Sequence, residues 1–336
     1  MELRHIRYFL AVAEEGSFTK AAARVGIGQP PLSLQIKDLE AEVGALLFHR
    51  LPHGAELTEA GRAFRDAVAA MPGQAEEAIR LARRASRGEL GSLGLGCIAS
   101  AAVNPIVSTA IRGFRRAYPD VELRLEESSS AVLAAGLREG RLGAAVIRPN
   151  RADARDLRLH LIAEDALVAA LPAGHELAAQ TGPLALATLA NETFVITARE
   201  IGAGLYDTVV EACRQAGFEP RFGQPAPQIA TLLALVAAEF GVALFPASMR
   251  QLSVAGVVFR SLERPAPKVP LTVAVLREER SELVRNFVLQ AAPRPRRCAP
   301  AGEARPQARP MRRGRGSARS VAMKSRAAAG ASGPLK

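Results

Sequence analysis

The sequence predicts an α/β protein with a helical N-terminal module, a long connecting helix and a larger C-terminal module. Three observations support this organisation. Residues 17–39 read as two short helices around a tight turn, residues 58–88 place apolar residues at helical spacing, and short apolar runs alternate with helical stretches from Leu90 onward. A chain of 336 residues has room for two or three such domains.

The second helix of the 17–39 segment has an apolar side and an open side. The apolar side repeats at helical spacing and is expected to be buried; it consists of Leu32, Ile36, Leu39 and Val43. The opposite side carries Pro30, Ser33, Leu34 and Lys37. Ser17 is expected to cap the first helix, and Gly26 and Gly28 bracket the turn. This pattern predicts a helix-turn-helix, whose second helix suits a DNA major groove; the alternative is a helical hairpin inside a larger core.

The flanking sequence favours the helix-turn-helix. The segments RYFLAVAEEGSFTKAA, QPPLS, QIKDLE and LF.R...LTEAG follow one another between residues 7 and 61. In this order and spacing they resemble the N-terminal winged helix-turn-helix of the LysR-type transcriptional regulators. The resemblance implies that residues 1–62 form a domain that binds double-stranded DNA. The DNA contacts are expected from the start and open side of the recognition helix and from the wing, at Gln29, Pro30, Ser33, Leu34, Lys37, Arg50 and His53.

Two positions depart from the pattern of that family. Leu34 stands where many members carry Arg or another polar residue, and Pro52 and His53 occupy a wing that is usually rich in Arg. An Arg can form a bidentate bond to guanine, whereas a Leu makes only apolar contact, for instance with a thymine methyl group. We therefore expect DNA binding to be retained with an altered base preference.

The net charge of +11 does not come from the predicted DNA-binding domain. Residues 291–336 hold 12 Lys and Arg and one acid, which leaves 32 of each sign in residues 1–290. Residues 292–336 are rich in Pro, Gly, Ala and Arg without an apolar period, so this basic tail is expected to be disordered. It reads either as a sequence-independent DNA anchor or as a solvated appendage, and the second interpretation is favoured.

Residues 58–89 are predicted to form a linker helix. Thr58 can cap it, and apolar residues step by four and three along it; this seam consists of Phe64, Val68, Met71, Ala75, Ala78 and Ala82. Such a seam buries little unless a second copy lies alongside, and the family resemblance implies a dimerisation helix. The alternative is an amphipathic helix packed on its own domain. Pro72 and Gly73 predict a kink in the middle, because proline cannot donate a hydrogen bond to the preceding turn.

The C-terminal module alternates predicted strands with predicted helices. The strands are expected at residues 93–100, 121–127, 143–147, 166–172, 193–197, 242–246, 257–262 and 271–277. The helices are expected at residues 105–119, 132–142, 206–217, 229–241 and 282–290. This alternation predicts an α/β architecture with mainly parallel sheets. The order resembles the LysR-family effector domain, a two-lobed fold similar to periplasmic binding proteins. The resemblance implies that the effector-binding domain spans residues 90–291, with one lobe at 91–162 and 267–291 and the other at 163–266.

In such a fold a ligand binds between the lobes, at strand ends and helix N-termini, where free N–H groups favour an anion. The predicted effector-binding residues are Ser100, Ser128, Ser129, Ser130, Arg148, Ile201 and Gly202. Each serine taken alone also reads as a helix cap. The segments RPN and GLYD resemble the subgroup that senses aromatic acids, so the effector is expected to be an aromatic or other organic acid. Gly143 and Glu239 depart from residues that are frequent in relatives.

The resemblance implies a cytoplasmic regulator of transcription that forms a homodimer or homotetramer. Two-fold pairing of the recognition helices predicts an inverted-repeat promoter site as the DNA partner. No metal and no cofactor are expected, because Cys97, Cys213 and Cys298 lie far apart without ligand spacing. No membrane partner is expected either, since the longest apolar stretch, residues 229–238, is too short to span a bilayer.

Two other functional classes were compared with this interpretation. An enzyme is disfavoured: Gly94-x-Gly96-x-x-Ala99 falls inside an apolar run rather than after it, G-x-S-x-G is absent, and the histidines are scattered. A pure small-molecule binding protein would need only residues 91–291. The N-terminal module and the lack of a secretion signal speak against it.

Overall fold

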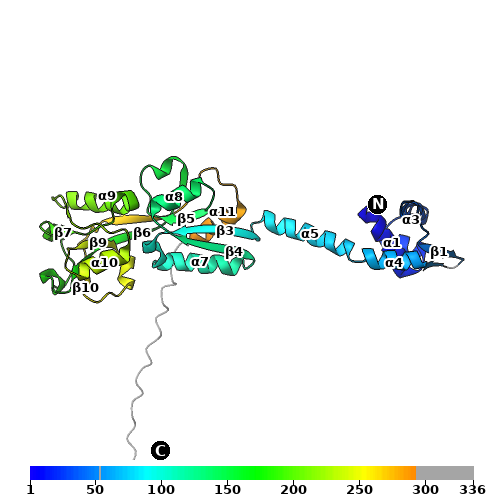
Figure 1. The fold of residues 1–336 in the computed structure, drawn as a ribbon, viewed down its shortest axis with the longest axis horizontal. Helices are drawn as coiled ribbons and strands as arrows, with labels where there is room; N and C mark the ends of the chain where they lie inside the picture. The colour runs from blue at the N-terminus through cyan, green and yellow to red at the C-terminus, as the bar shows by residue number, and fades with distance from the viewer. Residues whose placement is uncertain (53, 293–336) are drawn as a thin grey trace, which may run out of the picture. The chain divides into compact units, whose positions relative to one another are not determined.

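The computed structural model describes residues 1–52 and 54–292 (Figure 1). Two predictions concern residues outside this part of the chain: the DNA contact from His53 and the disorder of the tail beyond Ala292. In the described ranges, no helix is long and apolar enough to cross a membrane.

The N-terminal domain consists of helices and a two-stranded wing. Its elements are α1 (Leu3–Glu15), α2 (Phe18–Val25), α3 (Gln29–Val43), β1 (Phe48–Leu51), β2 (Gly54–Leu57) and α4 (Glu59–Val68). The Ser17 hydroxyl accepts a hydrogen bond from the Lys20 amide, and Gly26 closes α2 with a φ of +73°. Gly28 instead precedes α3 with a φ of −69°, so that position does not require glycine.

The apolar side of α3 packs into a small core around Phe9 of α1. Leu32, Ile36 and Leu39 are fully buried there, as the spacing predicts. The prediction was wrong for Val43, which is 39% exposed. It lies in the last turn of α3, directly before the helix ends at Gly44, and therefore extends past the buried part of the helix.

The helix expected over residues 58–88 is two helices. Thr58 caps α4 through the Gly61 amide, and α5 (Met71–Ser86) starts after a break at Ala69 and Ala70. Pro72 lies in the first turn of α5, where a missing N–H costs nothing, so the interruption lies just before the predicted position of Pro72 and Gly73. The first seam residues, Phe64 and Val68, pack in the N-terminal core, whereas none of the residues of α5, all described, is buried.

Within the described residues, the C-terminal domain is built on a seven-stranded sheet of order β10-β6-β11-β5-β3-β4, with β9 also pairing with β6 (Figure 1). These strands are β3 (Gly91–Cys97), β4 (Val121–Glu127), β5 (Ala144–Ile147), β6 (Leu157–Pro172), β9 (Ala243–Pro246), β10 (Val257–Ser261) and β11 (Lys268–Leu276). The prediction of mainly parallel sheets was wrong. Only β4 and β5 run parallel to β3 in this sheet; β6 and β11 form long antiparallel pairings because the chain returns to the first lobe through β11.

Helices and a second, small sheet complete the domain. The helices are α6 (Ala99–Ala102), α7 (Pro105–Ala117), α8 (Ser130–Arg138), α9 (Arg199–Gln215), α10 (Ile229–Ala237) and α11 (Glu282–Ala291), and β7 (Thr193–Phe194) pairs in parallel with β8 (Arg221–Phe222). Figure 1 shows α7 and α8 on opposite sides of β3. Helix α9 begins seven residues before its predicted start and carries a non-helical kink at Gly202.

Strands β6 and β11 connect two hydrophobic cores. Ile162 of β6 and Leu271 of β11 belong to the core beneath β3 and α7, whereas Leu167 and Val269 belong to the core beneath α9. The short crossing segment between them therefore includes residues 163–166 of β6 and Pro270 of β11. Its two strands stay hydrogen-bonded throughout, with a register shift between Leu271 and Thr272.

Glu239 follows α10 with a φ of +62°, and it is the one non-glycine residue of the described chain with a positive φ. This left-handed conformation normally favours glycine. The departure noted at Glu239 in the sequence therefore lies at a position where glycine would fit the backbone better.

Candidate functional site

The start of α3 presents an open polar face. Gln29, Pro30, Leu34 and Lys37 are exposed, and Ser33 is half-buried. Two prolines in the first turn remove N–H groups that would have no partner inside the helix, so the sequence can begin α3 here without a side-chain cap. Leu34, at 57% exposure, places an apolar side chain on this face. Such a face is suited to contacts with base edges.

The wing residue Arg50 lies against the recognition helix. Its guanidinium carbon is 5.1 Å from the centre of the Phe18 ring, and its Nη1 donates to Ser33 Oγ over 3.4 Å. Gln29 Nε2 donates to the same oxygen over 3.5 Å. Three predicted DNA contacts, Gln29, Ser33 and Arg50, therefore form one polar cluster.

A buried carboxylate joins the recognition helix to the wing. Glu40 is 6% exposed, and its Oε1 accepts hydrogen bonds from the backbone amides of Leu47 at 2.8 Å and Phe48 at 3.1 Å. These amides lie where the chain enters β1. Because both bonds involve a charged acceptor, they hold the base of the wing firmly to α3.

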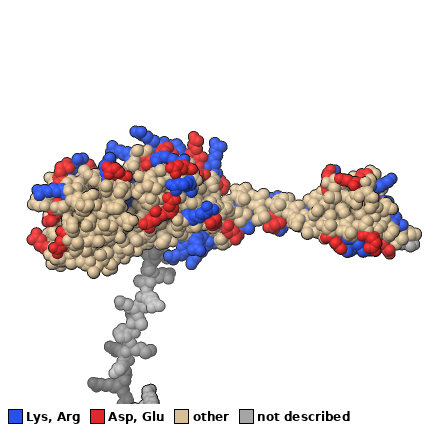
Figure 2. All heavy atoms as spheres, viewed as in Figure 1, with Lys and Arg blue, Asp and Glu red and all other residues tan. Residues whose placement is uncertain are grey.

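Charge on this domain is mixed. Residues 1–62 carry 7 basic and 8 acidic side chains, and both signs lie on the face seen in Figure 2. DNA attraction therefore depends on the placement of individual side chains, such as Lys37 and Arg50, and not on a net charge.

The C-terminal domain contains a cavity of about 480 Å³ between its two cores. Every residue predicted to bind the effector lines it: Ser100, Ser128, Ser129, Ser130, Arg148, Ile201 and Gly202. Sequence reasoning missed other lining residues, which belong to the strand ends and helices of the second lobe and to the end of β4: Thr197, Tyr206, Gln228, Ile229 and Glu127. The cavity thus joins segments that lie far apart in the sequence.

The serines occupy distinct positions around the cavity. The Ser129 hydroxyl caps α8 by accepting from the Val132 amide at 3.3 Å, and Ser130 is the first residue of that helix. The capping interpretation therefore applies to Ser129. Ser100 is 4% exposed and its hydroxyl instead accepts from Arg148 Nε at 3.3 Å. The α8 N-terminus opens at Ser128–Ser130, which is a favourable position for an anion.

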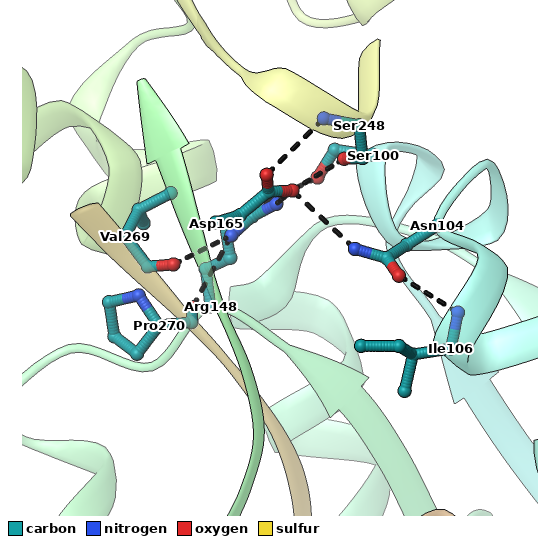
Figure 3. Close-up of polar contacts among 8 residues, drawn as sticks. All are labelled: Ser100, Asn104, Ile106, Arg148, Asp165, Ser248, Val269 and Pro270. Carbon is teal, nitrogen blue, oxygen red and sulfur yellow. Dashed lines mark hydrogen bonds and ion pairs between the residues drawn. The ribbon is translucent and has the colours of Figure 1, made fainter. Parts of the chain in front are cut away.

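Arg148 lines the cavity and is 3% exposed. Figure 3 shows its polar contacts. Its Nη1 donates to the carbonyls of Val269 at 3.3 Å and Pro270 at 3.4 Å, and its Nη2 to Asp165 Oδ2 at 3.5 Å. Burial lowers the pKa of Arg148 to about 10, and Asp165 opposes that shift, so the guanidinium remains charged near neutral pH. The cavity lining therefore includes a positive charge, which Asp165 already partly neutralises.

The cysteines of the described chain do not form a reactive site. Burial, with a smaller contribution from Glu127 and Glu219 respectively, raises the pKa of the Cys97 and Cys213 thiols to about 12. Thiolate is the nucleophilic form, so both thiols are inert near neutral pH. The described part of the chain also holds no cluster of three His, Cys, Asp or Glu side chains arranged for a metal ion.

Comparisons with known proteins match both the N-terminal and the C-terminal domain of this chain. A family described as "Bacterial regulatory helix-turn-helix protein, lysR family" matches residues 3–62, and one described as "LysR substrate binding domain" matches residues 86–294. The HTH-type transcriptional regulator BudR of Raoultella terrigena is 38% identical over 288 residues, which cover 86% of this chain and 99% of BudR. The chain belongs to the LysR family.

Solved structures of LysR-family proteins have the same fold. The crystal structure of CbnR, a LysR family transcriptional regulator, matches with a TM-score of 0.73 and 26% identity, covering 87% of this chain and all of CbnR. Full-length CbnR complexed with its target DNA matches with a TM-score of 0.72, 26% identity and 87% and 98% coverage. The chain is thus a LysR-type DNA-binding transcriptional regulator with an effector-binding domain, and not an enzyme.

The most informative residues that sequence reasoning missed in this LysR-type domain are Asp165 and Ser248. Asp165 is 8% exposed within β6, and the Ser248 amide and hydroxyl both donate to it, at 3.2 and 2.5 Å (Figure 3). A signal for Asp165 was present, because two adjacent acids, Glu164 and Asp165, interrupt the apolar run of residues 161–172, and alternation along a strand places one of them on the buried face. The sequence holds no comparable signal for Ser248, since a serine after a strand is common.

Proposed function

We propose that this regulator binds an inverted-repeat promoter site as a homo-oligomer and that a small carboxylate in the cavity modulates this binding. The observation that carries the carboxylate is the convergence of Ser100, Arg148 and the α8 N-terminus around one cavity. Serine hydroxyls, a guanidinium and free helix N–H groups all donate hydrogen bonds, as an anion requires. A regulator of bacterial promoters of this kind acts in the cytoplasm.

Apolar side chains also line the cavity and favour an organic acid over an inorganic anion. Ile98, Ile196, Leu205 and Ile229 line it beside the polar groups. A volume of about 480 Å³ lies within the range of small-molecule sites. An aromatic acid would place its ring against these side chains and its carboxylate at the serines, which makes it the finer form of the proposal.

The exposed apolar residues of α5 support a homo-oligomer, either a dimer or a tetramer. Met71, Ile79 and Leu81 are 38%, 51% and 42% exposed, which is unfavourable in water unless another surface covers them. A second copy of α5 would cover them and would place two recognition helices in two-fold symmetry. In a LysR relative, CbnR, the full-length protein has been crystallised with its target DNA.

The lobe boundaries and the DNA contacts belong to the same proposal. The lobes divide at residues 162/163 and 266/267, close to where β6 and β11 pass between the two cores. Gln29, Pro30, Ser33, Leu34, Lys37 and Arg50 would contact DNA, and their exposure on α3 and the wing supports this role.

A thermal-shift screen tests the carboxylate. Acetate and benzoate, each added as the sodium salt, are expected to raise the melting temperature of the wild-type chain, because a ligand that binds the folded state stabilises it. Ser100→Ala removes one hydrogen bond to a charged group and should weaken the response at least about tenfold in concentration. Ser253→Ala, at an exposed serine away from the cavity, is the matched control. An unchanged Ser100→Ala response would contradict the site.

Selection of bound sequences from random duplex DNA, followed by footprinting, tests the DNA partner. Two symmetric protected half-sites separated by whole helical turns are expected. Asymmetric protection would contradict the proposed two-fold arrangement.

A further inference from the structure

One buried polar network connects the cavity to both strands that pass between the cores. Arg148 donates to Ser100 on the cavity side and to the carbonyls of Val269 and Pro270 on β11 (Figure 3). It also donates to Asp165 on β6. Val269 and Asp165 are paired residues of these two strands. A single guanidinium thus contacts the cavity and both crossing strands.

Asp165 does not line the cavity, but it accepts hydrogen bonds from one residue of each lobe. Asn104, which caps α7 in the first lobe, donates to Asp165 Oδ2 at 3.5 Å. Ser248, which follows β9 in the second lobe, donates its amide to Oδ1 and its hydroxyl to Oδ2. The carboxylate therefore binds groups from both lobes at the point where the chain passes between them.

The bonding at Ser100 leaves room for a ligand. A serine hydroxyl has one hydrogen to donate and two acceptor positions. The Ser100 oxygen accepts from Arg148, and no acceptor for its own hydrogen occurs among the described residues. A carboxylate in the cavity can take that hydrogen while it lies close to the guanidinium.

A bound anion also changes the balance of charge around Arg148. The two charged side chains are 3% and 9% exposed, so their attraction is little screened by water. A second negative charge beside the guanidinium competes with Asp165 for it. Weakening the Arg148–Asp165 contact loosens the carboxylate that holds Ser248 and Asn104, and so alters how the two lobes are held together.

We propose that Asp165 and Ser248 are positioning residues that convert occupancy of the cavity into a change in the arrangement of the two lobes, acting through Arg148. This inference rests on the proposed carboxylate function. A ligand can shift an equilibrium only if it binds the two arrangements with different affinity, and the competition for the guanidinium provides that difference.

The test compares adjacent residues of one strand in the full chain. Asp165→Asn keeps the shape of the side chain and removes its charge. Glu164→Gln makes the same change one position earlier, at an exposed side chain that pairs with Lys268 on the same two strands. Ser248→Ala removes the hydroxyl but keeps the Arg148–Asp165 pair, so it provides the test if Asp165→Asn fails to fold. Ser248→Thr restores a hydroxyl.

The measured quantities are the affinity for the carboxylate probe and the affinity for the selected duplex, with and without the probe. The probe is whichever of acetate and benzoate stabilises the wild-type chain. Its saturation is expected to change wild-type DNA affinity by about fivefold or more. Ser248→Ala should bind probe and free duplex as the wild type does. Asp165→Asn should bind free duplex as the wild type does and the probe at least as tightly, because the carboxylate that competes for Arg148 is gone. Both variants should show less than about a twofold effect of probe on DNA affinity. Glu164→Gln and Ser248→Thr should respond as the wild type does.

The outcomes separate this inference from the proposed function. A wild-type chain that responds to neither probe overturns the carboxylate function and this inference with it. A responsive wild type with Asp165→Asn and Ser248→Ala equally responsive overturns only the positioning role. Loss of probe binding in both variants also overturns it, because the residues would then serve only to form the cavity.

Discussion

The DNA-reading face and the effector cavity are built in opposite ways. The residues proposed to contact DNA lie within residues 29–37 of one helix, plus Arg50 of the wing, and most of their side chains are exposed. The cavity instead gathers residues from segments between Ile98 and Ala230, and its central charge, Arg148, is buried. The first region is mostly one face of a single helix, whereas the second exists only when the whole sheet has formed. The two regions should therefore differ in how mutations affect them.

The largest expected effect is the loss of DNA binding, without loss of the carboxylate response, after a mutation in the core of the N-terminal domain. Phe9 is fully buried, with the rings of Phe48 and Phe64 centred 5.2 and 5.0 Å away. Phe9→Ala should lower the free energy of unfolding of the N-terminal domain by about 3–5 kcal/mol and abolish the gel shift. The carboxylate-dependent rise in melting temperature should remain, because Phe9 belongs to a core separate from the cavity.

Leu289→Ala, at a side chain that is 64% exposed on α11, is the control and should change stability by no more than about 0.5 kcal/mol. If Phe9→Ala also abolished the carboxylate response, the regions would not be independent.

A change on the DNA-reading face should alter base preference with little effect on stability. Leu34→Arg puts a bidentate donor on the exposed side of α3 and should favour guanine at one position of each half-site by about 1–3 kcal/mol. Repeating the duplex selection with the variant measures this preference, and its melting temperature should match the wild type. Identical selected sequences for both chains would show that Leu34 does not face the bases.

The smallest effect is expected beside the cavity-forming helix α10. Glu239→Gly relieves a left-handed backbone that costs about 1–2 kcal/mol for an ordinary residue, against a loss of about 0.5–1 kcal/mol in chain entropy for glycine. A net stabilisation of about 0.5 kcal/mol in urea unfolding is therefore expected.

Ala238→Gly is the matched control, since Ala238 has a φ of −87° and gains nothing from glycine. It should be destabilising. If both variants lowered stability, the backbone at Glu239 would not be strained.

The same contrast explains what the sequence could predict. Local rules placed Ser17 as a cap, Leu32, Ile36 and Leu39 in the core and an interruption of the linker helix near Pro72, because each depends on residues within one or two turns. The serines at strand ends were also found, since a strand-to-helix junction is visible in the sequence. The family resemblance, together with these junctions, predicted which residues line the cavity.

Features that depend on distant pairing were missed. The strand expected at 166–172 begins at Leu157 in the structure. Its first half pairs with β11, and polar and apolar residues alternate there too irregularly for the strand to be recognised from the sequence. The antiparallel pairing of β11 with β6 and the bonds from Ser248 to Asp165 join positions about 80 to 120 residues apart, and no local pattern encodes them.

The position of β11 between β5 and β6 also determines the order in which the domains of a nascent chain can fold. The N-terminal domain has all its residues by Val68 and can fold while the ribosome is still synthesising the sensor. The first lobe, by contrast, can be completed only after residues 268–291 have emerged, because an interior strand, β11, and one helix, α11, are synthesised last. A chain that ends before residue 268 would therefore contain the complete DNA-binding domain but lack part of its effector-binding domain.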